Sequence, residues 1–155
     1  MKVFDDLSLP EDYRATLRDN GIGDGDMHVI RRGKDRWYSP HEYHDVCSKS
    51  RLMICFSESE SQGIAWAEAW SMDVPTLIWR NERKVIDGKE THVSTAPYLT
   101  PQTGRFFNDT ADLSRLLGEI GAGEVSFAPR RWVLEYMSDE VCAGKLLELA
   151  GIPLR

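Results

Sequence analysis

Apolar residues in the middle of the chain form two short continuous runs on either side of a longer apolar segment. The runs at residues 52–56 and 75–79 are typical of strands that are covered on both faces. Residues 63–72 between them are apolar at almost every position, which predicts a helix that is buried nearly all round. A strand, a helix and a second strand in this order predict a βαβ unit with parallel, neighbouring strands.

Weaker patterns predict further elements on both sides of this unit. Capping residues followed by apolar positions three and four apart predict helices. These helices are expected at residues 11–19, 40–49, 111–120, 127–137 and 138–150. Short strands are expected at residues 3–4 at an edge of the sheet, at 27–30 and at 103–107. The charged segment 80–91 predicts an exposed loop, and strands that alternate with helices predict an α/β fold.

The composition is that of one ordinary globular domain. The chain has 155 residues, 41% of them hydrophobic and 28% charged, which suits a single domain at residues 1–155. A net charge of −6 argues against nucleic acid as an electrostatic partner. No apolar run approaches the length of a membrane span, and residues 1–10 lack an apolar signal core. Three scattered cysteines suggest reduced thiols, so we expect a cytoplasmic protein.

Two carboxylates of the βαβ unit are candidates for chemistry. Glu60 follows the first strand at its carboxyl end, where open α/β sheets bind ligands and where a helix start offers N–H groups to an anion such as a diphosphate. Glu68 is the only charged residue of the predicted helix, and a lone buried carboxylate is costly unless it is hydrogen-bonded or paired. The residue types alone favour a solvated Glu60 and a Glu68 held by an arginine or a backbone amide.

The loop and helix also carry a more specific pattern. Residues 60–69 are Glu-Ser-Gln-Gly-Ile-Ala-Trp-Ala-Glu-Ala, and residues 73–75 are Asp-Val-Pro. This pattern resembles the signature of the retaining GT-B glycosyltransferases of family 4, which has a glutamate, a glycine three residues on, a second glutamate eight residues on and a turn ending in Val-Pro. The chain departs from the family at residues 61–62, where Gly-Phe is usual, and at residues 72–73, where Cys-Gly or similar is usual.

The resemblance implies a Rossmann-like, three-layer α/β/α domain with a mostly parallel sheet, the donor-binding half of a GT-B fold. Such a domain binds a nucleotide-diphosphate sugar for retaining transfer to an acceptor in glycan or polysaccharide biosynthesis. Glu60 would be the catalytic residue beside the sugar, and Glu68 would bind the ribose of the nucleotide. The loop residues implied in donor binding are Ser61, Gln62, Gly63 and Ile64. The family generally needs no metal, and no cofactor is implied besides the donor substrate.

Other candidate residues lie outside this pattern. Arg32 and Gly33 follow the strand expected at residues 27–30 and are further donor-binding candidates, because basic residues there suit a phosphate as well as a solvated loop. Residues 98–104 would line the pocket by family position, or else form a long surface connection. Two metal-like spacings carry little weight. They are Asp24 with Asp26, and His41 with His44 and Cys47.

The chain is too short for the N-terminal acceptor domain of two-domain family members, and we expect that a partner chain supplies it. A donor-domain strand with an arginine and a lysine to steady the leaving diphosphate is also not evident. The alternative from another class is a non-catalytic, Rossmann-like nucleotide-binding or interaction module in which the motif is a relic. A dinucleotide-binding oxidoreductase is disfavoured, because no Gly-x-Gly-x-x-Gly follows a strand.

Overall fold

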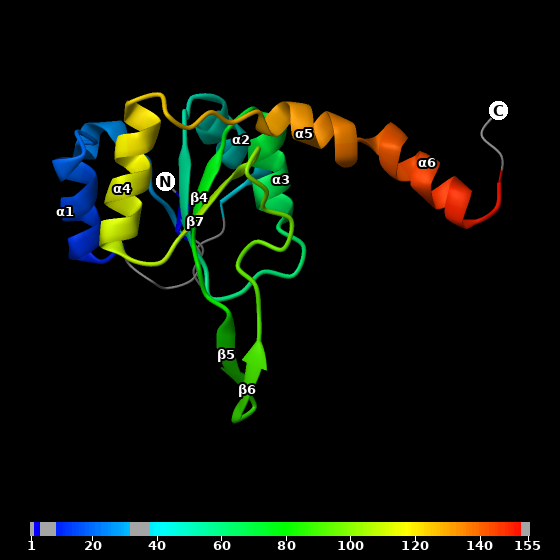
Figure 1. The fold of residues 1–155 in the computed structure, drawn as a ribbon, viewed down its shortest axis with the longest axis horizontal. Coiled ribbons are helices and arrows are strands. Elements are labelled where there is room, and N and C mark those ends of the chain that lie inside the picture. The colour runs from blue at the N-terminus through cyan, green and yellow to red at the C-terminus, as the bar shows by residue number, and fades with distance from the viewer. Residues whose placement is uncertain (1, 4–8, 32–37, 153–155) are drawn as a thin grey trace.

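The computed structural model describes residues 2–3, 9–31 and 38–152. Their centre is a parallel sheet of five strands in the order β2-β1-β3-β4-β7 (Figure 1). The strands are β1 (Lys2–Val3), β2 (Ile30–Arg31), β3 (Met53–Phe56), β4 (Thr76–Trp79) and β7 (Gly104–Phe107). Counted along the chain this order is 2-1-3-4-5, which is one of the common orders of doubly wound sheets. The α/β class and the parallel pairing of β3 with β4 are thereby confirmed.

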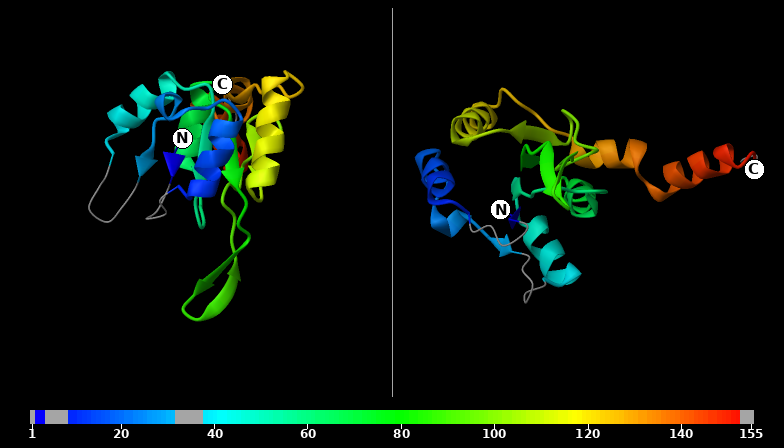
Figure 2. Two further views of the ribbon diagram at one scale, coloured as in Figure 1. Left: turned by 90° about the vertical axis from the view of Figure 1, so that its left-hand side faces the viewer. Right: turned by 90° about the horizontal axis from the view of Figure 1, so that it is seen from below.

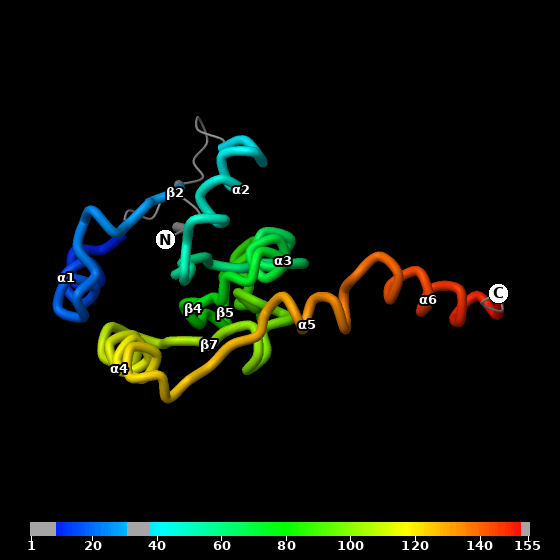
Figure 3. Tube along the Cα trace, turned by 90° about the horizontal axis from the view of Figure 1, so that it is seen from above, coloured from blue at the N-terminus to red at the C-terminus, as the bar shows by residue number. Residues whose placement is uncertain are grey.

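Helices lie against both faces of the sheet. They are α1 (Glu11–Asp19), α2 (Pro40–Ser48), α3 (Ile64–Ser71), α4 (Thr110–Gly121), α5 (Pro129–Tyr136) and α6 (Asp139–Leu149), with a short 3-10 turn, η1 (Asp24–Asp26). α1 and α4 cover one face, and α2 and α3 cover the other (Figure 3). α5 packs on α3, whereas α6 extends away from the body (Figure 1). None of the helices in the described ranges is long and apolar enough to cross a membrane.

Alternate strand residues build a separate core on each face of the sheet. Ile54 and Leu77 contribute to the core under α1 and α4, while Cys55 and Ile78 contribute to the core under α2 and α3. All four side chains are at most 5% exposed. The continuous apolar runs of β3 and β4 arise because both faces of these strands are covered.

The charged segment after β4 is a hairpin, so the prediction of a loop was wrong. β5 (Arg83–Ile86) and β6 (Lys89–His92) pair in antiparallel fashion and project from the carboxyl edge of the sheet (Figure 2). Asp87 and Gly88 between them have φ of 50° and 76°, as a type I′ turn requires, and Asp-Gly is a preferred sequence for that turn. The turn residues, rather than the surrounding charge, determine the local structure.

Two predictions near the N-terminus also need correction. The strand expected at an edge is β1, and it lies between β2 and β3 because the crossovers through α1 and α2 place those strands on its opposite sides. Phe4 of that prediction lies outside the described residues. The strand expected at residues 27–30 is reduced to Ile30–Arg31. Residues 27–29 have no regular secondary structure, and the turn before them is held by a hydrogen bond from the Gly23 N–H to Asp26 Oδ2 at 3.0 Å.

Candidate functional site

Helix α3 has one buried face and one exposed face. Trp66 and Trp70 are each 1% exposed, whereas Ile64 is 63% exposed and Glu68, one turn further on, is also exposed. The prediction of a helix buried all round, with a buried Glu68, was therefore wrong. Ala65 and Ala67 leave little area to bury, so the two tryptophans and Ala69 suffice as the buried face. Glu68 makes no hydrogen bond or ion pair with any residue that the structure describes.

The orientation of α3 is fixed by contacts from three neighbouring elements. Tyr43 of α2 donates a hydrogen bond to the Ala65 carbonyl, and burial followed by the nearby Cys47 raises the pKa of this phenol, which stays a donor. Trp70 Nε1 donates to Thr76 Oγ1 of β4 at 3.1 Å. Trp132 of α5 packs edge-on against Trp70, with ring centroids 5.6 Å apart.

Gly63 forms the junction between the loop and α3. It is the N-cap residue, with φ of 68°, in the left-handed region that favours glycine. A Cβ at this position would lie 2.7 Å from Trp66 Cδ1, so no larger residue fits without movement of the indole ring. As a glycine it provides no side chain that could cap the helix. The glycine that follows Glu60 by three residues is thus explained by the turn over Trp66.

The Glu60 side chain folds back on its own loop. Its Oε1 accepts hydrogen bonds from the N–H groups of Ser61, at 2.9 Å, and Gln62, at 3.3 Å. The backbone N–H of Glu60 donates to the Ser94 carbonyl at 2.7 Å. Glu60 is half-buried and holds the loop in shape, so it is not simply a solvated residue.

The loop after β3 is tied to the segment that leaves β4. Asn81 Nδ2 donates a hydrogen bond to the Glu58 carbonyl at 2.7 Å, and Lys84 Nζ lies 2.9 Å from Glu58 Oε2. Together with the Glu60–Ser94 hydrogen bond, these contacts join three segments that are far apart in sequence. They meet at the carboxyl ends of β3 and β4.

A cavity of about 420 Å³ opens where these segments meet. It lies at the carboxyl edge of the parallel sheet, where such sheets bind ligands. Its lining consists of residues 80–82 after β4, residues 92–97 after β6, Leu99, and Phe106 of β7. We call this cavity the carboxyl-edge groove. The family resemblance placed residues 98–104 at the pocket, but of these only Leu99 lines the groove.

Buried hydrogen bonds hold one wall of this groove against α3 and β4. Trp66 Nε1 donates to the Thr95 carbonyl at 3.1 Å. Thr95 Oγ1 donates in turn to the Trp79 carbonyl at 2.9 Å. Thr95 is 1% exposed, so the Trp66 hydrogen bond is shielded from water, whereas the one to Trp79 is part-buried. The wall is therefore anchored to the same helix that begins with the Glu60 loop.

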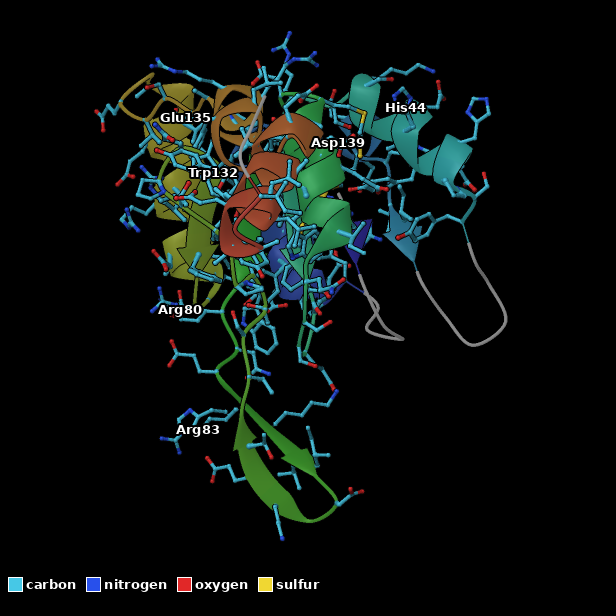
Figure 4. The ribbon with its side chains drawn as sticks, turned by 90° about the vertical axis from the view of Figure 1, so that its right-hand side faces the viewer. His44, Arg80, Arg83, Trp132, Glu135 and Asp139 are labelled. Carbon is cyan, nitrogen blue, oxygen red and sulfur yellow. The ribbon has the colours of Figure 1, made fainter. Side chains whose placement is uncertain are left out.

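The groove contains one arginine that sequence reasoning did not identify. Arg80 follows β4 directly, and its guanidinium carbon lies 4.9 Å from the centroid of the Phe106 ring. Figure 4 shows Arg80 where the hairpin leaves the sheet. The signal was present in the sequence, because a basic residue that directly follows a buried strand lies at the carboxyl edge.

A second cavity, of about 930 Å³, lies at the opposite edge of the sheet. It is lined by α1, α2 and the segments that lead into β2 and β3. We call it the amino-edge cavity. The lining residues are Leu17, Gly21, Ile22, residues 25–28, Asp45, Val46, residues 49–52 and Ile54.

The remaining candidates of the sequence analysis do not form a site. Arg32 and Gly33 lie outside the described residues. His41 and His44 are exposed, whereas Cys47 on the same helix is 2% exposed and packs in the core. The two aspartates are engaged with the protein, Asp24 with Arg14 and Arg18 and Asp26 with the Gly23 N–H. Within the described ranges, no three metal-ligating side chains come together.

Three comparisons with known proteins identified no related protein. The chain matches no protein-family model, no curated protein and no solved structure. The family resemblance therefore rests on residues 60–75 alone, and the description of the fold rests on the structure.

Proposed function

We propose that this chain is the nucleotide-sugar donor domain of a retaining glycosyltransferase of the GT-B type. The observation that carries the proposal is that the loop of the Glu60-to-Pro75 pattern adjoins a groove at the carboxyl edge of a parallel sheet, although no residue of the pattern lines that groove. The loop of the pattern and the groove share hydrogen bonds through Ser94 and Asn81. The reaction class comes from the resemblance, and the position of the groove supports it.

Glu68 has the properties of a ribose ligand. Its carboxylate is exposed, and no described residue donates a hydrogen bond to it, so both oxygens are available to two neighbouring hydroxyls. This assignment explains why Glu68 is exposed, because a carboxylate in an internal ion pair would have to break that pair before it could bind a ligand.

Glu60 would act at the sugar, and its loop would contribute backbone donors. The N–H groups of Ser61 and Gln62 already bind the Glu60 carboxylate, so an anionic ligand would have to compete with that carboxylate for them. The first N–H groups of α3, including those of Gly63 and Ile64, have no helical acceptor and favour a negative partner. Transfer would then require Glu60 to leave its own loop and contact the sugar hydroxyls.

The acceptor would be bound by a partner chain, and we place the protein in the cytoplasm. The hairpin beside the groove offers a surface for such a partner, because Val85 and Ile86 are 68% and 45% exposed. No metal or further cofactor is part of this proposal.

The second candidate function is a non-catalytic nucleotide-binding or interaction module. The hydrogen bonds of Glu60 to its own loop favour this alternative, since a carboxylate with a structural role needs no catalytic one. Turnover distinguishes the two functions. Slow hydrolysis of a bound nucleotide sugar that Glu60→Gln abolishes supports the enzyme, whereas donor binding without any turnover supports the module.

The test of donor binding is a calorimetric titration with UDP, GDP, ADP and their sugar conjugates. We expect nucleotides of one base to bind. Glu68→Ala should lower the affinity for the sugar conjugate of that nucleotide about tenfold or more, which corresponds to about 1.4 kcal/mol of binding free energy. The matched control is Glu148→Ala, which removes an exposed helical glutamate from α6 and should leave the affinity unchanged. Absence of binding to every nucleotide, or equal affinity in both variants, would contradict the proposal.

A further inference from the structure

Arg80 is held in the carboxyl-edge groove by an aromatic ring. Its guanidinium carbon lies 4.9 Å from the centroid of Phe106, within the range of a cation–π contact. Phe106 belongs to β7 and packs against the core under α3, so the ring is a fixed platform. The Arg80 side chain is 46% exposed, which leaves its donors accessible from the groove.

The N–H donors of the Arg80 guanidinium are not used by any residue that the structure describes. Among the described residues its nearest carboxylate is Glu82, with Nη1 and Oε1 3.7 Å apart, too far for a hydrogen bond. The Glu82 side chain is 68% exposed, so solvent screens this ion pair. No described residue accepts a hydrogen bond from the Arg80 guanidinium, which has five N–H donors.

Two other arginines of this part of the chain, Arg105 and Arg83, donate hydrogen bonds within the protein. Arg105 also stacks on a ring, that of Phe127 at 5.3 Å, but its Nη1 donates to the Pro101 and Gly104 carbonyls at 2.6 and 2.8 Å. Arg83 Nη1 donates to Glu90 Oε1 at 2.7 Å. Arg80 therefore combines a fixed orientation with unused donors, as expected of a residue that binds a ligand.

We propose that Arg80, stacked on Phe106, binds a phosphate of a diphosphate ligand in the carboxyl-edge groove. The planar guanidinium suits the bidentate binding of phosphate oxygens, and the long contact with Glu82 is readily exchanged for such a ligand. The assignment of a diphosphate rests on the proposed function, because a nucleotide sugar carries one. Arg80 would then supply the positive charge that stabilises a leaving diphosphate.

The test is a calorimetric titration of the full chain with inorganic pyrophosphate at low ionic strength. We expect the wild type to bind, Arg80→Ala to weaken binding at least tenfold, and Arg80→Lys to recover part of the loss because it keeps the charge without the planar fork. The matched control is Arg83→Ala. This variant also removes one positive charge, three residues further along the chain, but the Arg83 guanidinium is already paired with Glu90 (Figure 4 labels both arginines). It should change the affinity less than twofold.

Two results would overturn the phosphate site. One is the absence of pyrophosphate binding, and the other is an equal loss in Arg80→Ala and Arg83→Ala, which would indicate a general electrostatic effect. A nucleotide sugar that binds wild type and Arg80→Ala equally also contradicts the site, although it supports the donor function. Pyrophosphate binding that only Arg80→Ala reduces, with no binding of any nucleotide sugar, supports the site and contradicts the donor function.

Discussion

The two cavities lie at opposite edges of the same sheet, and the larger one has the weaker chemistry. The amino-edge cavity measures about 930 Å³ and the carboxyl-edge groove about 420 Å³. The amino-edge cavity contains an ion pair between Lys49 and Asp45, with 2.8 Å between nitrogen and oxygen, so these charges neutralise each other. The groove contains Arg80, whose donors the described residues leave unused. An arginine stacked on an aromatic ring, and the polarity of the parallel strands, therefore indicate a ligand site better than volume does.

The structural basis of the groove also differs from that of the amino-edge cavity. The loops around the groove are joined by buried hydrogen bonds of Trp66 and Thr95 and by the close contact of β4 with β7. The amino-edge cavity is bordered by η1 and by exposed residues of α2, whose side chains are less tightly packed. Substitutions at the two edges should thus have unequal effects.

The largest expected effect is that of Gly104→Ala, at the amino end of β7, where the neighbouring Leu99 lines the groove. The new Cβ would lie 2.0 Å from the Thr76 carbonyl oxygen and 2.9 Å from Leu99 Cδ1, so β4 and β7 would have to separate. We expect a loss of about 3 kcal/mol or more in the free energy of unfolding, measured by urea denaturation. Gly25→Ala in the amino-edge cavity is the control, because no atom of the described residues lies within 4 Å of its added Cβ. Equal unfolding midpoints for the two variants would contradict the comparison.

An intermediate effect is expected for Trp66→Phe, which removes the indole donor to the Thr95 carbonyl. Loss of a partner at a buried carbonyl costs about 1–3 kcal/mol, and the wall of the groove should loosen with it. Trp79→Phe is the matched control, since its Nε1 donates to the Asn108 carbonyl near the surface. Chemical denaturation should show a clearly smaller loss for Trp79→Phe. If Trp79→Phe lowered the free energy of unfolding as much as Trp66→Phe does, the hydrogen bond to the Thr95 carbonyl would contribute no more than one near the surface.

The smallest expected effect concerns Asp112, at the start of α4 beyond the carboxyl end of β7. Partial burial alone would raise the pKa of Asp112, but hydrogen bonds from Arg115 and Asn108 outweigh it and hold the pKa below its ordinary value. A lowered pKa in the folded state stabilises the protein above the unfolded pKa of about 3.9, and this contribution is lost as the pH falls through the folded value. Asp112→Asn should therefore cost up to about 1 kcal/mol at neutral pH and nothing in strong acid.

The control for Asp112 lies in the amino-edge cavity. A hydrogen bond from Lys49 lowers the pKa of Asp45, but this carboxylate is exposed and its interaction is screened. Unfolding curves of Asp45→Asn and wild type should coincide between neutral pH and acid. A pH-dependent difference for Asp45→Asn as large as that for Asp112→Asn would show that burial does not distinguish the two sites.

The sequence predicted those parts of the fold that depend on local pattern. The apolar runs at residues 52–56 and 75–79 identified two adjacent parallel strands, because strands covered on both faces have no polar side. The order of the five strands depends on long-range packing and was not predicted. The hairpin was predictable in principle from Asp87-Gly88, a turn sequence whose meaning the neighbouring charges obscured.

The sequence predicted where the Glu60 loop lies in the fold, but it did not predict the groove or the exposure of Glu68. The residues of the loop, from Glu60 to Ile64, lie at the carboxyl end of β3 as expected. The exposure of Glu68 could not be derived from composition, because alanines suit both buried and exposed helix faces. The groove itself requires that residues after β4, after β6 and on β7 meet, and no local pattern specifies that meeting.

The most direct test of the account is to map ligand contacts by amide chemical shifts in ¹⁵N-labelled protein. UDP, GDP, ADP and their sugar conjugates would be added one at a time. The account predicts that one of them shifts the amides of residues 60–64, 80–82 and 92–97, around the carboxyl-edge groove. Shifts that cluster at residues 21–28 and 45–52, around the amino-edge cavity, or no shifts with any nucleotide, would contradict it.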